Sequence, residues 1–331
     1  MTGRPAPTPA RPTTARGDLP GSEVSVDPDR FGDAPALPEF LAPLYPFERA
    51  TLTLARDRNA GRRLHFAEAG PAGRRPVLLL HGNPTWGFLW RRVISDLDEL
   101  RCVAPDLLGL GLSDRLPRVA DHTVDRHAEA IAELAESLDL RGVILVGQDW
   151  GGPILTATAA RLPERIAGLV LANTAVVLPR HLRGTAFHRF SRLPIVSDIA
   201  FRLFGFPVKS LHRAQGDPDS ISGDVALAYQ WPLRRISDRV APLALVRMVP
   251  DGPKHPSVPA LERGQEWLLG FRGPTALVWG TRDPILGRAL SRHQKQLPDA
   301  IVRTTEAGHF LPEEVPEVLA QAIREVAHRA S

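Results

Sequence analysis

Asp149 stands at the centre of a Gly-Gln-Asp-Trp-Gly segment, residues 147–151, and its carboxylate is a candidate nucleophile. The run before it, 143–146, is apolar like a buried strand, and the stretch after it, 151–157, has the small residues of a helix start. A strand, a sharp turn flanked by glycine and a helix would present this side chain above a parallel sheet. A carboxylate is ionised near neutral pH and suits displacement at an sp3 carbon, which forms an alkyl ester on the protein. Serine in this place would indicate an esterase, so the aspartate argues against the opening of ordinary esters and amides.

Two further polar residues follow strand-like runs nearer the C-terminus. Asp283 follows the run 275–279, and His309 follows the run 300–303. Because ligands of open parallel sheets bind at the carboxyl ends of the strands, we expect both side chains to lie beside Asp149. Nucleophile, acid and histidine in this chain order are typical of the α/β-hydrolase triad. We therefore predict Asp149 as the nucleophile, His309 as the general base and Asp283 as the carboxylate that orients His309.

A turn after an earlier strand completes the predicted site. The apolar run 77–80 leads into a His-Gly-Asn-Pro turn at residues 81–84. In this type of fold, that turn supplies one backbone N–H group and the residue after the nucleophile supplies the other. The N–H groups of Asn83 and Trp150 are therefore predicted to form an oxyanion hole, and His81 is predicted to stabilise the turn.

The elements that must position these residues alternate along the chain. Strand-like runs lie at 51–54, 63–68, 77–80, 100–104, 143–146, 169–171, 275–279 and 300–303. Helical patterns lie at 88–97, 123–137, 152–161 and 315–329, with Thr123 or Asp121 as the N-cap of the second. This alternation predicts an α/β fold with a mostly parallel, doubly wound sheet.

Two regions depart from this alternation. Residues 1–36 are rich in Pro, Ala, Arg, Thr and Gly without hydrophobic periodicity, so we expect a disordered N-terminal extension. Residues 178–268 carry many aromatic residues but little strand signal, which predicts an inserted helical cap. The sheet domain would then consist of residues 37–177 and 269–331.

The composition restricts the class of protein. The chain has 331 residues and a formal charge of +4, without a dense basic run that alternates with aromatic residues, which argues against nucleic-acid binding. Cys102 is its one cysteine, which excludes an intrachain disulfide and fits a reducing compartment. We find neither the apolar stretch of a secretory signal nor an 18-residue apolar run. We therefore expect a cytoplasmic protein that does not bind membranes.

Four segments together resemble one family. They are His-Gly-Asn-Pro-Thr-Trp at 81–86, the Asp-Leu-Leu-Gly segment that begins at Asp106, Gln-Asp-Trp-Gly-Gly at 148–152 and Gly-His-Phe at 308–310. In combination they look like a haloalkane dehalogenase, over a region from about Leu37 to the C-terminus. The resemblance implies hydrolysis of haloalkanes to a primary alcohol and halide through an ester on Asp149. It implies a halogenated alkane and water as the only partners and no metal or organic cofactor, and it leaves the oligomeric state open.

The resemblance also implies two N–H donors for the departing halide. One is Trp150, and the other is either Asn83 or the cap residue Trp231. Members of the family place the acid of the triad after the sixth or the seventh strand of the fold. The run that would precede a sixth-strand acid ends in Asn173, which is not a carboxylate, so Asp283 is favoured. An acid at Asp283 with donors at Asn83 and Trp150 resembles the subfamily with an Asp-His-Asp triad and an Asn-Trp halide pair.

Two alternatives stay open. Epoxide hydrolases share the fold, the nucleophile and the histidine, but they usually need two tyrosines from the cap to protonate the epoxide oxygen. The chain contains only Tyr45 and Tyr229, and Tyr45 precedes the sheet. The second alternative is a protein that binds a small molecule in the capped pocket without hydrolysing it.

Overall fold

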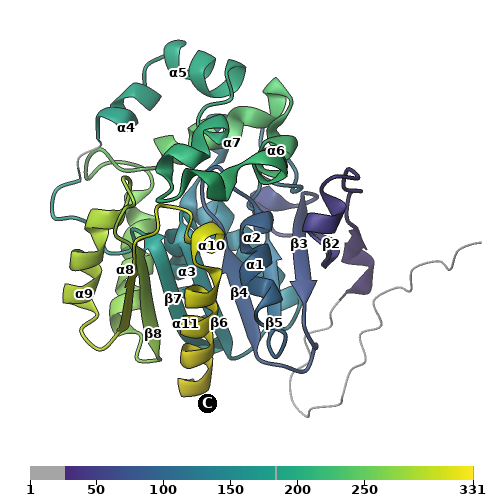
Figure 1. The fold of residues 1–331 in the computed structure, drawn as a ribbon, viewed down its shortest axis with the longest axis vertical. Helices are drawn as coiled ribbons and strands as arrows, with labels where there is room; N and C mark the ends of the chain where they lie inside the picture. Colours follow the sequence, from purple (N-terminus) through teal and green to yellow (C-terminus); the bar gives the residue numbers. More distant parts are fainter. Residues whose placement is uncertain (1–26, 183–184, 331) are drawn as a thin grey trace, which may run out of the picture.

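A nine-stranded sheet lies at the centre of the computed structural model, which describes residues 27–182 and 185–330 (Figure 1). The strand order is β1-β2-β3-β5-β4-β6-β7-β8-β9. Strands from β5 to β9 pair in parallel, whereas β1 to β3 pair antiparallel and β3 joins β5 antiparallel. The strands are β1 Phe31–Asp33, β2 Glu48–Thr53, β3 Arg63–Ala69, β4 Pro76–Leu80, β5 Arg101–Pro105, β6 Val143–Asp149, β7 Ile166–Thr174, β8 Thr275–Gly280 and β9 Ile301–Thr305. This arrangement confirms the predicted mostly parallel sheet of an α/β-hydrolase fold.

Two groups of helices pack on the sheet: α2, α3 and α8 contact one another, and α1, α10 and α11 form the second group. Figure 1 shows α11 in front of the strands and α3 behind them. Thr123, one of the two N-cap residues predicted for this helix, caps α2, since its hydroxyl accepts the backbone N–H of Arg126 at 3.1 Å. The helices of the sheet domain are α1 Arg91–Ser95, α2 Val124–Ser137, α3 Gly151–Ala159, α8 Val258–Gly270, α9 Leu290–Gln296, α10 Leu311–Glu314 and α11 Pro316–Arg329. Within the described residues, no helix is long and apolar enough to cross a membrane.

The central strands β4 and β6 are buried along almost their whole length. Their unbroken runs of Leu, Val and Ile fill both faces of the sheet, as expected for parallel strands covered by helices on both sides. Leu80 pairs with Gly147 at the carboxyl ends of these two strands. The pairing therefore brings the turn 81–84 beside Asp149.

A helical cap lies over this end of the sheet, where Figure 1 shows α4 to α7 above the strands. The side-chain amide of Asn83 donates a hydrogen bond to the carbonyl of Pro242 at 3.0 Å, which ties the cap to the turn after β4. Phe201, Leu243 and Val246 form a small apolar cluster of the cap's own. The cap helices are α4 Ala186–Ser191, α5 Val196–Asp198, α6 Gly223–Gln230 and α7 Val240–Arg247.

The expected C-terminal limit of the cap, residue 268, needs a correction. This position lies inside α8, and α8 packs along α3 and not with the helices of the cap. Gly264 permits the close approach, because a Cβ atom there would lie 2.8 Å from Oγ1 of Thr156 on α3. The cap therefore ends before Val258, and α8 belongs to the helix layer on the sheet.

The expected disorder of residues 1–36 is wrong for residues 27–36. Phe31 to Asp33 form β1, which pairs antiparallel with β2, and the Phe31 ring packs edge-on against Phe66. The free edge of β2, the Phe31 ring and the ion pair of Arg30 with Glu133 hold this segment on the sheet, although its composition is typical of disorder. Residues 1–26 lie outside the described residues.

Candidate active site

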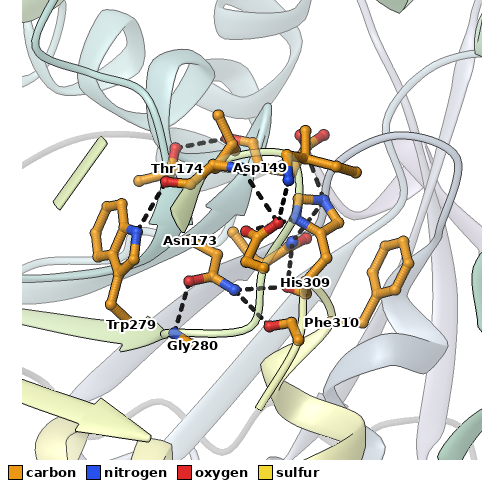
Figure 2. A network of polar contacts seen from close by, with 12 residues as sticks. Asp149, Asn173, Thr174, Trp279, Gly280, His309 and Phe310 are labelled. Carbon is orange, nitrogen blue, oxygen red and sulfur yellow. Dashed lines mark hydrogen bonds and ion pairs between the residues drawn. The ribbon is translucent and has the colours of Figure 1, made fainter. Parts of the chain in front are cut away.

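Asp149 occupies the sharp turn between β6 and α3 (Figure 2), and its backbone φ is +50°. This left-handed conformation is strained for a residue other than glycine, so the surrounding structure must hold it. The hydroxyl of Thr174 donates a hydrogen bond to the Asp149 carbonyl oxygen at 2.6 Å. Gly151 lets α3 start against β4, since a Cβ atom there would lie 1.9 Å from the carbonyl oxygen of Leu80. These contacts fix the elbow that the sequence predicted.

His309 lies between two carboxylates. Its Nδ1 atom is 2.9 Å from Oδ2 of Asp283, and its Nε2 atom is 3.7 Å from Oδ2 of Asp149. Oδ1 of Asp283 accepts the backbone N–H groups of Ile285 and Leu286 at 2.7 and 3.1 Å. The fixed Asp283 carboxylate places the proton of the neutral ring on Nδ1, which leaves the lone pair of Nε2 on the side of Asp149. The structure thus brings together the three residues of the predicted triad.

Backbone N–H groups stabilise the carboxylate of Asp149. Oδ1 accepts the backbone N–H of Asn83 at 2.7 Å, and the backbone N–H of Trp150 also donates to this carboxylate. Gly82 makes the approach possible, because a Cβ atom there would lie 2.3 Å from Oδ1. Both predicted oxyanion donors therefore bind Asp149, while Oδ2 faces His309.

The surroundings of Asp149 and His309 raise the pKa of both residues. Burial raises the pKa of Asp149, although His309 and the two N–H groups oppose this change. For His309, burial by itself lowers the pKa, but the charge and hydrogen bond of Asp283 and the charge of Asp149 outweigh burial and raise it. Conversion of Asp149 to a neutral ester would remove its charge, so the pKa of His309 would fall when a base is needed.

The predicted halide donors Trp150 and Asn83 differ in how many of their side-chain N–H groups already form hydrogen bonds. The indole N–H of Trp150 makes no hydrogen bond to any residue among 27–182 and 185–330, and the side chain is buried. The Asn83 amide donates one N–H to Pro242, which leaves its second N–H for a ligand, and its Oδ1 is buried without a partner in the described chain. Both residues flank Asp149, as the sequence predicted.

Trp231, the alternative halide donor, lies elsewhere. It lines a surface groove of the cap and carries the guanidinium of Arg234 over its ring, 4.5 Å from the ring centroid. Neither Asp149 nor His309 lines this groove. The structure therefore does not bring Trp231 into the site around Asp149.

Both tyrosines are buried, and their hydroxyl groups lie among residues that do not belong to the triad. Tyr229 is fully buried, and its hydroxyl donates to the carboxylate of Glu313, which also forms a two-pronged ion pair with Arg91 at 2.5 and 2.8 Å. Tyr45 packs against the rings of Trp86 and other aromatic residues of the sheet domain. Neither hydroxyl contacts a residue of the site.

Two carboxamides beside the triad were not predicted. Asn173 lies one residue before the end of β7. Its side chain donates to the carbonyl oxygens of Gly308 and His309 at 2.7 and 3.0 Å and accepts the N–H of Gly280 at 2.9 Å (Figure 2). Gln148 donates to the carbonyl oxygen of His309 at 3.1 Å, and the same nitrogen lies 3.3 Å from Nε2 of the ring. Both residues could have been found as polar side chains near the end of a strand. Gln148 directly precedes the nucleophile, and Asn173 stands where a sixth-strand acid would be.

Across the part of the chain that the structure describes, no group of three or more His, Cys, Asp or Glu side chains could hold a metal ion. The expected independence from cofactors stays a prediction.

Comparison with known proteins gives consistent relatives. A family model described as the alpha/beta hydrolase fold matches residues 75–194. A haloalkane dehalogenase of Mycolicibacterium paratuberculosis is 32% identical over 286 residues, which cover 84% of this chain and 92% of that protein. Haloalkane dehalogenase 2 of Mycobacterium bovis is 36% identical over 292 residues, 85% of this chain and 96% of the relative.

Solved structures agree with these relatives. The tetrameric haloalkane dehalogenase DpaA from Paraglaciecola agarilytica superposes with a TM-score of 0.76 at 25% identity, over 85% of this chain and 94% of that one. The haloalkane dehalogenase DatA from Agrobacterium tumefaciens gives a TM-score of 0.72 at 27% identity, over 82% and 94% of the two chains. The similarity extends over the sheet domain and the cap together.

Proposed function

Because this chain belongs to the haloalkane dehalogenases, which hydrolyse carbon–halogen bonds, we propose that it does so through a covalent ester on Asp149. The observation that carries this mechanism is the asymmetry of the Asp149 carboxylate. The backbone N–H of Asn83 holds Oδ1 at 2.7 Å, whereas Oδ2 faces Nε2 of His309. Oδ2 is therefore the oxygen that is free to attack.

In the first step, Oδ2 of Asp149 attacks the carbon that bears the halogen. A carbon–oxygen bond forms as the carbon–halogen bond breaks, and the halide leaves with the bonding electron pair. The indole N–H of Trp150 and the second N–H of Asn83 stabilise the charge that develops on the halogen. Neutral donors suit this task, because they stabilise the anion without a cationic charge that would retain it.

In the second step, His309 takes a proton from water on Nε2 while the water oxygen attacks Cγ of the Asp149 ester. The tetrahedral oxyanion forms on Oδ1, the oxygen that already accepts the N–H of Asn83, and the N–H of Trp150 stabilises the charge of the same carboxyl group. Collapse of this intermediate breaks the ester, and the alkoxide leaves as an alcohol with the proton that His309 returns. Asp283 stabilises the transient imidazolium and keeps the ring in place.

The site supports the subfamily that the sequence resembled, with an Asp-His-Asp triad and an Asn-Trp halide pair. Asp283 binds His309, and Asn173 occupies the end of β7, where a sixth-strand carboxylate would stand. Trp231 lies in a different groove. A small halogenated alkane and water remain the expected partners, and the cytoplasm remains the expected location.

Epoxide hydrolysis is less well supported. Opening an epoxide requires an acid beside the ring oxygen, but the Tyr229 hydroxyl is buried and donates to Glu313. Non-hydrolytic binding is also less well supported, because the triad is complete and His309 is hydrogen-bonded as a base requires.

A paired substrate panel tests the proposed function. Purified protein is mixed with terminal bromoalkanes and iodoalkanes of several chain lengths, and halide release is measured. A matched panel of terminal epoxides is assayed in parallel for diol formation. We expect halide release and no diol; diol formation without any halide release would contradict the proposal.

A further inference from the structure

We propose that Gln148 is a positioning residue for catalysis, whose amide N–H binds Nε2 of His309 and holds the imidazole neutral and aligned until water arrives. This inference rests on the proposed function and adds a group that keeps the base ready. It depends on two contacts of the buried Gln148 side chain with His309, one with Nε2 of the ring and one with the backbone carbonyl oxygen.

The amide nitrogen of Gln148 contacts two acceptors. It lies 3.1 Å from the carbonyl oxygen of His309 and 3.3 Å from Nε2 of the ring. Because a carbonyl oxygen can only accept, the atom of Gln148 beside it must be the nitrogen and not the oxygen. The amide has two N–H groups, so it can donate to both acceptors at once. Gln148 is fully buried, so neither contact competes with bulk water.

The direction of this hydrogen bond selects a protonation state. Nδ1 already donates to Asp283, so the neutral ring offers only the lone pair of Nε2 to a donor. In the imidazolium, Nε2 would carry a proton and would face the N–H of Gln148, which is repulsive. The contact therefore favours the neutral ring over the charged ring.

Such a donor has a clear purpose in this site. The charged groups that face His309 are both carboxylates, Asp283 from the loop after β8 and Asp149 from β6, and they raise its pKa. The other polar contacts of His309 are made by its backbone: Asn173 donates to its carbonyl oxygen, and the carbonyl of Ala214 accepts its N–H. Gln148 is the neutral donor among these neighbours that opposes the two carboxylates at Nε2. Without it, more of the histidine would be protonated near neutral pH and unable to act as a base.

The contact also fits the order of the reaction. Nε2 has a single lone pair, so the water that attacks the ester must replace the N–H of Gln148 there. Before that moment the ring is held by Asp283 on one side and by Gln148 on the other. The second contact, to the His309 carbonyl, keeps the amide in place while its partner on Nε2 changes.

The test follows the two chemical steps separately at a series of pH values. Parent and Gln148→Met are mixed with a short bromoalkane, and the Asp149 ester is measured by intact mass as it forms and decays. Methionine keeps the length of the side chain but has no N–H. The acid limb is the pH range in which the rate of ester decay falls as the pH is lowered. In Gln148→Met we expect this limb to move to higher pH by roughly half to one unit, the effect of one neutral hydrogen bond. Gln148→Glu should move it further in the same direction, because a carboxylate would accept from the imidazolium.

Asn173→Ala is the matched control. Asn173 binds the same loop but touches His309 only at its carbonyl oxygen. Its replacement should slow ester decay without moving the acid limb. The proposal is overturned if the limb of Gln148→Met coincides with that of the parent, or if Asn173→Ala moves it equally.

Nitrogen-15 NMR follows the protonation of Nε2 of His309 in the protein without substrate. Nε2 should become protonated at a lower pH in the parent protein than in Gln148→Met, and equal titration of the two proteins would contradict the proposal. Failure of the proposed function is distinct from these outcomes, because it would appear as a parent protein that releases no halide and forms no ester.

Discussion

Nε2 of His309 lies 3.7 Å from Oδ2 of Asp149, close enough for charge interaction but too far for a hydrogen bond. The base therefore does not engage the oxygen that must attack the substrate. Oδ1, in contrast, accepts the backbone N–H of Asn83 before any chemistry takes place. One carboxylate thus offers a free oxygen for the first step and a preorganised oxyanion site for the second.

Replacement of His309 should separate the two steps. In His309→Ala, Asp149 can still displace halide once, but no base activates water for ester hydrolysis. We expect one equivalent of halide per protein and a mass increase that equals the alkyl group. Intact-mass spectrometry after incubation with a bromoalkane checks this. An unchanged mass in a variant that still binds the substrate would show that Asp149 forms no ester.

The rate of ester decay should depend on pH through His309. In the ester, Asp149 no longer carries a charge, so only the charge and hydrogen bond of Asp283 raise the pKa of this histidine against its burial. The protonated ring cannot accept a proton, so the decay rate should fall as pH drops through the pKa that His309 has in the ester and should level off above it. Stopped samples across the pH range give this profile. A decay rate that is independent of pH on the acid side would argue against His309 as the base.

The halide donors can be tested as a set of three. Trp150→Phe and Asn83→Ala each remove one donor, and each should slow carbon–halogen cleavage by about 100- to 1000-fold, as loss of one oriented donor does elsewhere. Trp231→Phe is the control from the separate groove and should leave cleavage unchanged. The halide burst of the first turnover measures this step alone. A loss confined to Trp231→Phe would place the second donor in the cap after all.

The buried ion pair of Arg91 and Glu313 should matter for stability. Glu313→Ala leaves the buried Arg91 guanidinium and the Tyr229 hydroxyl without their acceptor, so the free energy of unfolding should fall by about 3 kcal/mol or more. The control is Glu306→Ala, which removes the partner of Arg282 in a pair exposed to solvent and should cost less than about 1 kcal/mol. Urea denaturation measures both. Equal losses in the two variants would contradict the difference in burial as the cause.

Much of the fold and the triad could be predicted because the signals are local. Apolar runs bounded by turns mark the parallel strands, and polar residues just after these strands must meet at one edge of the sheet. Asp149, Asp283 and His309 each follow such a run, so their chain order was enough to group them. The turn with Asn83 was placed by the same logic.

The parts that escaped prediction depend on distant partners. The segment of Phe31 looked disordered by composition, but it is ordered by the open edge of β2. Trp231 is an aromatic residue of the cap like others, and only the path of the chain puts it in an outer groove. The roles of Gln148 and Asn173 arise from contacts with a loop more than 130 residues away, which no local pattern specifies.

The most direct test of the covalent ester uses a single turnover in water labelled with oxygen-18. If Asp149 attacks carbon, the alcohol of the first turnover carries an unlabelled oxygen from the carboxylate, and the label enters Asp149. Mass spectrometry of the alcohol and of the peptide that contains Asp149 reads both products. We expect an unlabelled alcohol and a labelled Asp149; a labelled alcohol with an unlabelled Asp149 would mean that water attacks the substrate directly.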